Sequence, residues 1–266
     1  MENLSLPLIL FTLLTQASIG AAVVAAVRQW QTADGPQRPI AEWGTIAGLL
    51  AVGVLASFFH LGHPEAVYRI VTNVGSAWLS REILTFVVFV VLVALALWSA
   101  WRGPVNGWLM KAIAVVGVVA VAMMGMTYAP AGQPAVHNIW PFVFFMLTAA
   151  TAGSAVASYF TPEKKQGLVA WVFSTGALIS LVIYLAVPCV WLSGDAVVAA
   201  TGKAFLTSPL YWLYILVGLV APLAVVARMR RIPSWLPVLV LFGEFVGRAA
   251  FFMLMLTSGS NIGNPF

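Results

Sequence analysis

The segment ILTFVVFVVLVALALW, residues 83–98, carries no charged side chain and decides the class of fold. The hydrocarbon core of a bilayer is about 30 Å thick, and about 20 apolar residues cross it as a helix. Because a backbone in lipid must satisfy its own hydrogen bonds, such a segment is expected to be helical. Seven more stretches of this kind fill most of the 266-residue chain, which is 62% hydrophobic and 8% charged. The sequence therefore predicts an all-α integral membrane protein.

Short segments rich in turn-forming residues separate the eight stretches. We expect a single transmembrane domain, 1–266, with helices over about 6–28, 42–62, 79–101, 108–129, 138–160, 168–192, 210–229 and 234–256. Pro188 and Pro222 lie within the sixth and seventh of these helices and are expected to kink them. No basic residue precedes the first apolar run, so we expect that helix to be retained rather than removed as a signal peptide.

Lysine and arginine are distributed unequally between the two sides of the predicted bundle. The first, third, fifth and seventh connections and their flanks hold Arg28, Arg38, Arg102, Lys111, Lys164, Lys165, Arg228, Arg230 and Arg231. The opposite side holds Arg69, Arg81 and Lys203, and Arg248 lies inside the last helix. Since positive residues accumulate on the cytoplasmic side, we expect both termini on the periplasmic side of a bacterial inner membrane.

The composition excludes several classes of function. The net charge of +5 comes mostly from the connecting segments, so there is no basic soluble face for nucleic acid. One cysteine, Cys189, cannot build a disulfide framework or a four-thiolate iron–sulfur cluster within the chain. The sequence also lacks the glycine fingerprint of a hydride cofactor. We therefore expect no metal, haem or iron–sulfur cluster here, and any electrons must pass directly to a partner.

Ionisable residues inside the predicted helices are few, and each is a candidate functional residue because a charge in the bilayer is costly. His60 ends the second helix, Glu82 begins the third, and Glu244 and Arg248 lie in the eighth. In the predicted orientation, His60, Glu82 and Arg248 all lie in the outer half of the membrane. Glu244 and Arg248 are four residues apart on one helical face, which predicts a structural ion pair.

Four short motifs give the sequence a likeness to a known family. They are HLG at 60–62 with Pro64, GSAWLS at 75–80 with Glu82 and Ile83, IWP at 139–141, and GEFVGR at 243–248. Over essentially its full length the chain resembles the membrane-anchor subunit of dimethyl sulfoxide reductase, a DmsC-like, quinol-interacting eight-helix anchor. His63 stands before the proline where the family is expected to have a small residue. Which of His60 and His63 meets the quinol therefore stays open.

The resemblance implies a three-subunit complex of anaerobic respiration. A molybdopterin catalytic subunit and a four-cluster iron–sulfur subunit would dock on this anchor, which would oxidise menaquinol and pass the electrons to the nearest cluster. His60 matches the quinol-site histidine of the family and Glu82 its neighbouring acid. Trp140 and Arg248 belong to the matching motifs and are carried over as quinol-binding residues. The catalytic subunit, not this chain, would select the terminal acceptor.

The chemistry of quinol oxidation agrees with these residue types. A neutral imidazole, with an ordinary pKa near 6.5, can accept a hydrogen bond and a proton from a quinol hydroxyl, which makes His60 the expected base. Glu82 is then expected to relay that proton to the outer aqueous side. Gly53 and Ser57 lie on the helical face of His60 and are expected to leave room for the quinol head.

Other functions remain open at this stage. A secondary transporter or channel tends to carry internal repeats and charged groups at the membrane midplane, and neither is evident. A passive anchor would only tether a soluble enzyme and leave the quinol to another subunit. A haem between His60 and His137 is a further alternative, although both residues are expected at outer helix ends. For docking of the partners we expect the periplasmic side, where the second connection and the outer ionisable residues lie.

Overall fold

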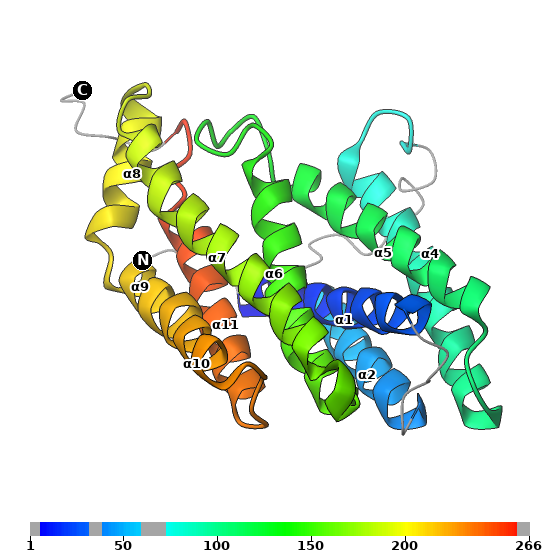
Figure 1. The fold of residues 1–266 in the computed structure, drawn as a ribbon. Helices are drawn as coiled ribbons and strands as arrows, with labels where there is room; N and C mark the ends of the chain where they lie inside the picture. The colour runs from blue at the N-terminus through cyan, green and yellow to red at the C-terminus, as the bar shows by residue number, and fades with distance from the viewer. Residues whose placement is uncertain (1–5, 32–38, 60–72, 260–266) are drawn as a thin grey trace.

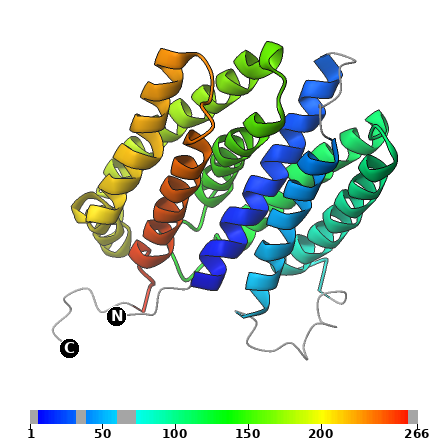
Figure 2. The same cartoon turned by 90° about the horizontal axis from the view of Figure 1, so that it is seen from below.

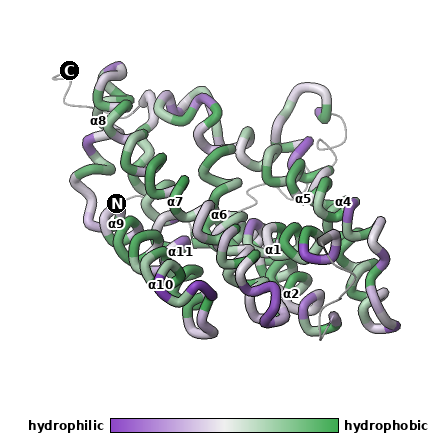
Figure 3. The backbone as a smooth tube through the Cα atoms, in the orientation of Figure 1, coloured by the Kyte–Doolittle hydropathy of each residue, from purple (hydrophilic) through white to green (hydrophobic). Residues whose placement is uncertain are grey.

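The computed structural model describes residues 6–31, 39–59 and 73–259. Within these ranges the regular structure is entirely helical, and eight helical segments are long and apolar enough to cross a membrane (Figure 1). Hydrophobic residues cover these helices, whereas hydrophilic residues gather mainly at the turns between them (Figure 3). The prediction of an all-helical protein with eight transmembrane helices is confirmed.

The bounds of the helices agree with the predicted spans to within a few residues. The first four membrane helices are α1 (Leu6–Gln31), α2 (Pro39–Phe58), α4 (Trp78–Arg102) and α5 (Gly107–Thr127). The next are α6 (Trp140–Ala157) and α7 (Gln166–Trp191), and the last is α11 (Leu236–Leu254). The seventh span consists of α9 (Pro209–Leu213), the π-helix η4 (Tyr214–Val220) and α10 (Ala221–Met229). Single 3₁₀ turns, η2 (Ser158–Phe160) and η3 (Glu163–Lys165), link α6 to α7.

Two features of this half of the chain were not predicted. The connection after α7 contains a further helix, α8 (Ala196–Thr207), whose N-terminus is capped by the Asp195 side chain, which accepts hydrogen bonds from two backbone N–H groups. Such a cap satisfies donors that a helix start leaves free. The π-helix η4 lies directly before Pro222, which has no N–H to donate to the preceding turn. At Pro222, where we expected a kink, the helix changes from the π form to the α form.

The membrane helices form two neighbouring groups that meet along α1 and α6. The first group comprises α1, α2, α4 and α5, and the second comprises α6, α7, α11 and the segment from η4 to α10. Helix α1 lies between α2 on one side and α11 on the other, with α6 packed along it (Figure 2). The start of α1 and the end of α11 lie at the same end of the molecule (Figure 2).

Glycines bring the two groups into close contact. A Cβ atom on Gly20 of α1 would overlap the backbone of Ala149 in α6, and one on Gly153 would overlap the backbone of Gly20. In lipid, helices gain little from hydrophobic burial, so small residues that let backbones approach are the main means of association. The contact between α1 and α6 therefore depends on these two glycines.

Replacing Gly153 by alanine should destabilise the protein by about 1–3 kcal/mol, because the new methyl group overpacks the crossing. The matched control is Gly48→Ala in α2, where a Cβ would meet nothing within 4 Å. That change should be neutral or slightly stabilising, since alanine favours the helix by about 1 kcal/mol over glycine. Thermal unfolding of the two purified variants in mild detergent measures the difference. Equal stabilities would contradict the role of Gly153.

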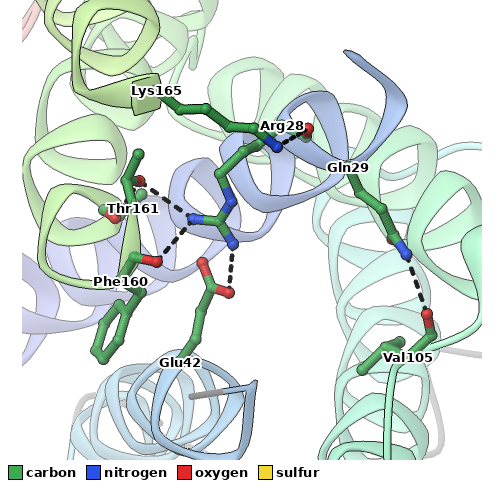
Figure 4. A network of polar contacts seen from close by, with 8 residues as sticks. Arg28, Gln29, Glu42, Val105, Phe160, Thr161 and Lys165 are labelled. Carbon is green, nitrogen blue, oxygen red and sulfur yellow. Dashed lines mark hydrogen bonds and ion pairs between the residues drawn. The ribbon is translucent and has the colours of Figure 1, made fainter. Parts of the chain in front are cut away.

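A buried polar network closes one end of the molecule, called here the Arg28 end (Figure 4). Arg28, at the C-terminal end of α1, forms an ion pair of 2.6 Å with Glu42 at the start of α2. The same guanidinium donates to Thr161 Oγ1 (3.1 Å), just after α6. Lys165 Nζ in turn donates to the Arg28 carbonyl (3.3 Å). Both members of the ion pair are buried, and the network ties the end of α1 to the start of α2 and to the connection between α6 and α7.

Candidate functional site

Glu82 is placed one turn into α4, at the end of the molecule opposite Arg28, called here the Glu82 end. Its side chain is only 2% exposed, and its Oε2 atom has no hydrogen-bond partner within the described residues. The Thr127 hydroxyl, at the end of α5, lies beside the carboxyl group. Burying a carboxylate oxygen without a hydrogen-bond partner costs free energy. Glu82 is therefore a candidate to bind a ligand or to hold a proton.

Ser57 lies at the Glu82 end of α2, one residue before that helix ends. It is half-buried, and its hydroxyl donates to the Val54 carbonyl at 2.7 Å. His60 and His63 lie outside the described residues. We expected Gly53 to leave room for a quinol head. It does not, because a Cβ there would meet Thr15 Cγ2 of α1 at 2.9 Å. Its small size serves the packing of α2 on α1.

Glu244 and Arg248 lie inside the second group, where both are almost fully buried. They do not form the direct ion pair that their spacing predicted. Instead, Thr148 of α6 joins them: its hydroxyl donates to Glu244 Oε2 (2.9 Å) and accepts from Arg248 Nη2 (3.1 Å). The other Glu244 oxygen accepts from Thr151 Oγ1 at 2.6 Å. The ion-pair prediction is corrected because the two side chains reach different neighbours, and α6 supplies the bridge.

Arg248 also reaches across to the first group. Its Nη2 atom donates to Gln16 Oε1 of α1 at 2.6 Å, and its guanidinium lies over the Phe145 ring, 4.0 Å from the centroid. Gln16 is fully buried, and its amide donates to the Met124 sulfur of α5 at 3.1 Å. The arginine therefore links α11 to α1 and α6 in the membrane interior, where an unpaired charge would be very costly.

Tyr128, at the C-terminal cap of α5, lies near both buried charges. It lies close enough to both Glu82 and Arg248 for each charge to act on its hydroxyl. Its ring packs against Phe145, the ring under Arg248, with centroids 5.4 Å apart. Tyr128 and Arg248 thus share the Phe145 ring, and the convergence of Glu82 and Arg248 on one site stays a prediction.

Trp140 occupies a different part of the Glu82 end. It begins α6 and stacks on Phe144, with ring centroids 6.2 Å apart, and Phe144 in turn packs on Tyr184 of α7. No hydrogen bond or ring contact joins Trp140 to Ser57, Glu82 or Arg248 in the described part of the chain. Its assignment to the quinol site therefore stays a prediction that rests on the motif alone.

Sequence reasoning missed several polar residues of this region. They are Gln16 in α1, Tyr128 after α5, and Thr148 and Thr151 in α6. A signal for three of them existed: Gln16 is a lone amide in an apolar run, and Thr148 and Thr151 are three apart, which places both on one helical face. Tyr128 looked like one of the many interfacial aromatics.

Arg248→Met should lower the stability of the folded protein by about 3–5 kcal/mol, because it leaves the Glu244 carboxyl and the Gln16 amide buried without their cation. The double variant Arg248→Met with Glu244→Gln removes the stranded charge and should recover part of the loss. Unfolding in a titration with a denaturing detergent measures both. Wild-type stability of the single variant would show that the guanidinium is not needed to hold α1, α6 and α11 together.

Metal-ligating side chains do not cluster among the residues that the structure describes: no three of His, Cys, Asp and Glu lie together there. His137 is in the connection between α5 and α6, where its Nδ1 atom lies 2.9 Å from the Ala129 carbonyl. That carbonyl fixes the imidazole in the connection, at the Glu82 end.

Eight apolar helices in two groups, with buried charges shared between them, define a multi-pass integral membrane protein. Residues 1–254 match the DMSO reductase anchor subunit (DmsC) family, and the chain belongs to this family. It is thus a membrane anchor of a molybdoenzyme complex, located in the bacterial inner membrane. The resemblance read from the four motifs is confirmed.

Relatives cover the chain almost completely. It is 28% identical over 281 residues to the anaerobic dimethyl sulfoxide reductase protein YnfH of Escherichia coli (strain K12), with 96% of each protein covered. A second anaerobic dimethyl sulfoxide reductase protein of the same organism is 25% identical over 277 residues, with 95% of the present sequence and 96% of the relative covered. A shorter match, 41% over 59 residues, joins 21% of the present sequence to 18% of a sulfite dehydrogenase subunit of Allochromatium vinosum.

Proposed function

We propose that this anchor binds and oxidises menaquinol at the Glu82 end and passes the electrons to an iron–sulfur partner subunit. The observation that carries the proposal is the Glu82 carboxyl group, buried near the start of α4 with one oxygen unpaired. A quinol hydroxyl is a hydrogen-bond donor that enters from the membrane and can satisfy such an oxygen. Ser57, on the neighbouring helix, lies at the same end of the molecule.

The residues of this end divide the work of the reaction. Oxidation of one menaquinol to menaquinone releases two electrons and two protons. His60, three positions after Ser57 in the sequence, takes the proton of one hydroxyl, and Glu82 accepts it and releases it to the periplasmic water. The same route then serves the second proton. Arg248 stabilises the negative charge that develops on the quinol oxygen through the Tyr128 hydroxyl, and Trp140 borders the site.

The electrons leave through a partner in this proposal. An iron–sulfur subunit with four clusters docks against the periplasmic face, and a molybdopterin catalytic subunit docks upon it. Both termini then lie on the periplasmic side, and the Arg28 end faces the cytoplasm, where the excess of Lys and Arg is found. The names of the relatives, an anaerobic dimethyl sulfoxide reductase protein and a sulfite dehydrogenase subunit, support a partner of this class.

The test is to purify the tagged protein from its native membrane in mild detergent and to analyse what accompanies it. Molybdenum or tungsten with several iron–sulfur clusters, seen by EPR and reduced by a menaquinol analogue, is the expected result. Clusters that the analogue does not reduce would make the protein a passive anchor. A protein that purifies alone, free of metal, and that moves a solute across liposomes would favour a transporter.

A further inference from the structure

An apolar groove runs along the seam between α2 and α4, on the outer surface of the first group. It has a volume of about 370 Å³, and every side chain that lines it is Ala, Val or Leu. Helix α2 contributes Ala51, Val54 and Leu55 among others, and α4 contributes Val90, Ala94 and Leu97. Ala51 and Ala94 are exposed, and Leu55 is 59% exposed, so the groove opens toward lipid.

The groove points toward the Glu82 end. Leu55 and Val54, at its outer end on α2, precede Ser57 by two and three residues, and the Ser57 hydroxyl is bonded to the Val54 carbonyl. On α4, the floor residue Val93 lies eleven positions after Glu82, which is close to three full helical turns. Glu82 and Val93 therefore share one face of α4, and the groove begins at Val90, eight positions or about 12 Å farther into the membrane than Glu82.

Phe86 lies between Glu82 and Val93 on that face but does not enter the seam. Its side chain is 7% exposed, and its ring packs on Phe11 of α1 with centroids 5.6 Å apart. The groove itself extends from Leu55 to Ala47 along α2, a rise of about 12 Å at 1.5 Å per residue. An extended hydrocarbon chain with methyl branches fits a groove of this length and composition.

The geometry points to this groove as the binding subsite for the polyprenyl tail of the quinol whose head is oxidised at the Glu82 end. The inference rests on the proposed function. A quinol that arrives from the bilayer keeps its tail in hydrocarbon. The α2–α4 seam offers that tail an apolar wall that is open to lipid and begins at Leu55, two residues before Ser57. Burial of the tail then contributes to affinity for long-chain quinols and contributes nothing for a headgroup alone.

The experiment compares two electron donors with the intact complex in proteoliposomes: a long-chain menaquinol and menadiol, which has no polyprenyl tail. Ala94→Phe and Ala51→Phe each fill the groove with a ring. Either variant should raise the KM for the long-chain menaquinol about tenfold, because the loss of a few apolar contacts between a hydrophobic site and its ligand has an effect of this size. The KM for menadiol should stay unchanged. The control is Ala186→Phe in α7, an exposed alanine of the other group, which should alter neither KM.

Each other outcome has a distinct meaning. Wild-type KM values for long-chain menaquinol in both groove variants would overturn the tail site and leave the groove to an ordinary lipid chain, with quinol oxidation intact. Equal losses with both donors would also overturn it, because the rings would then act on the head site or on folding, which co-purification of the partner subunits would detect. Failure of the wild-type complex to oxidise either donor would refute the proposed function itself, and the tail site with it.

Discussion

Replacing His60 by leucine should reduce menaquinol oxidation by about 100-fold or more while the complex still assembles. Leucine fills a similar volume but can neither accept a hydrogen bond from the quinol hydroxyl nor take its proton. The acceptor reductase activity, measured with an artificial reduced dye that donates to the partner subunits directly, should stay unchanged. The loss therefore separates the quinol step from the chemistry of the catalytic subunit.

Two further histidines provide the controls for this result. His137→Leu changes a residue at the same end of the molecule whose ring is held by the Ala129 carbonyl, and it should leave menaquinol oxidation near the wild-type rate. His63→Leu distinguishes the two imidazoles that the HLGHP segment offers. Wild-type turnover in His60→Leu together with a large loss in His63→Leu would move the base to His63. Wild-type turnover in both would remove histidine from the mechanism.

Glu82→Gln should slow menaquinol oxidation at least about tenfold, because an amide has nearly the shape of the carboxyl group but carries no proton onward. The free energy of unfolding should rise or stay the same. The carboxyl is buried with Oε2 unpaired, so a neutral amide there removes the cost of a buried charge. A fall in turnover without a fall in unfolding temperature is a result that a purely structural role for Glu82 would not produce.

The matched control for this substitution is Glu163→Gln, which removes an exposed carboxyl between α6 and α7, at the Arg28 end. It should change neither turnover nor stability. Stopped-flow reduction of the partner clusters by a menaquinol analogue measures the step directly. Reduction at the wild-type rate in Glu82→Gln would contradict the proton relay and leave Glu82 as a packing residue.

The sequence alone predicted the eight membrane helices and most of their bounds, because lipid imposes a local rule: an apolar run of sufficient length must be helical. It also singled out Glu82 and Arg248, since a charge in such a run stands out without any knowledge of its neighbours. Helix α8 was missed, although Asp195 is a good helix cap, because helix propensities are a weak signal over only twelve residues.

Only the tertiary structure decided what these residues contact. The i, i+4 spacing of Glu244 and Arg248 made a direct pair the natural prediction, yet Thr148 of α6 joins them and Gln16 of α1 holds the guanidinium. Gly53 seemed to leave space for a ligand, but that space is filled by Thr15 of α1. In each case the deciding neighbour lies on a helix far away in the sequence.

The sequence by itself therefore determined the class, the helices and the charged residues buried within them, because each follows from the transfer of a single segment into lipid. The contacts of Arg248 with Gln16 and Thr148, and the apolar groove between α2 and α4, were decided by tertiary structure alone. Packing between helices in lipid depends on the fit of side chains from several segments at once. The apolar composition of one segment does not indicate which helices it contacts.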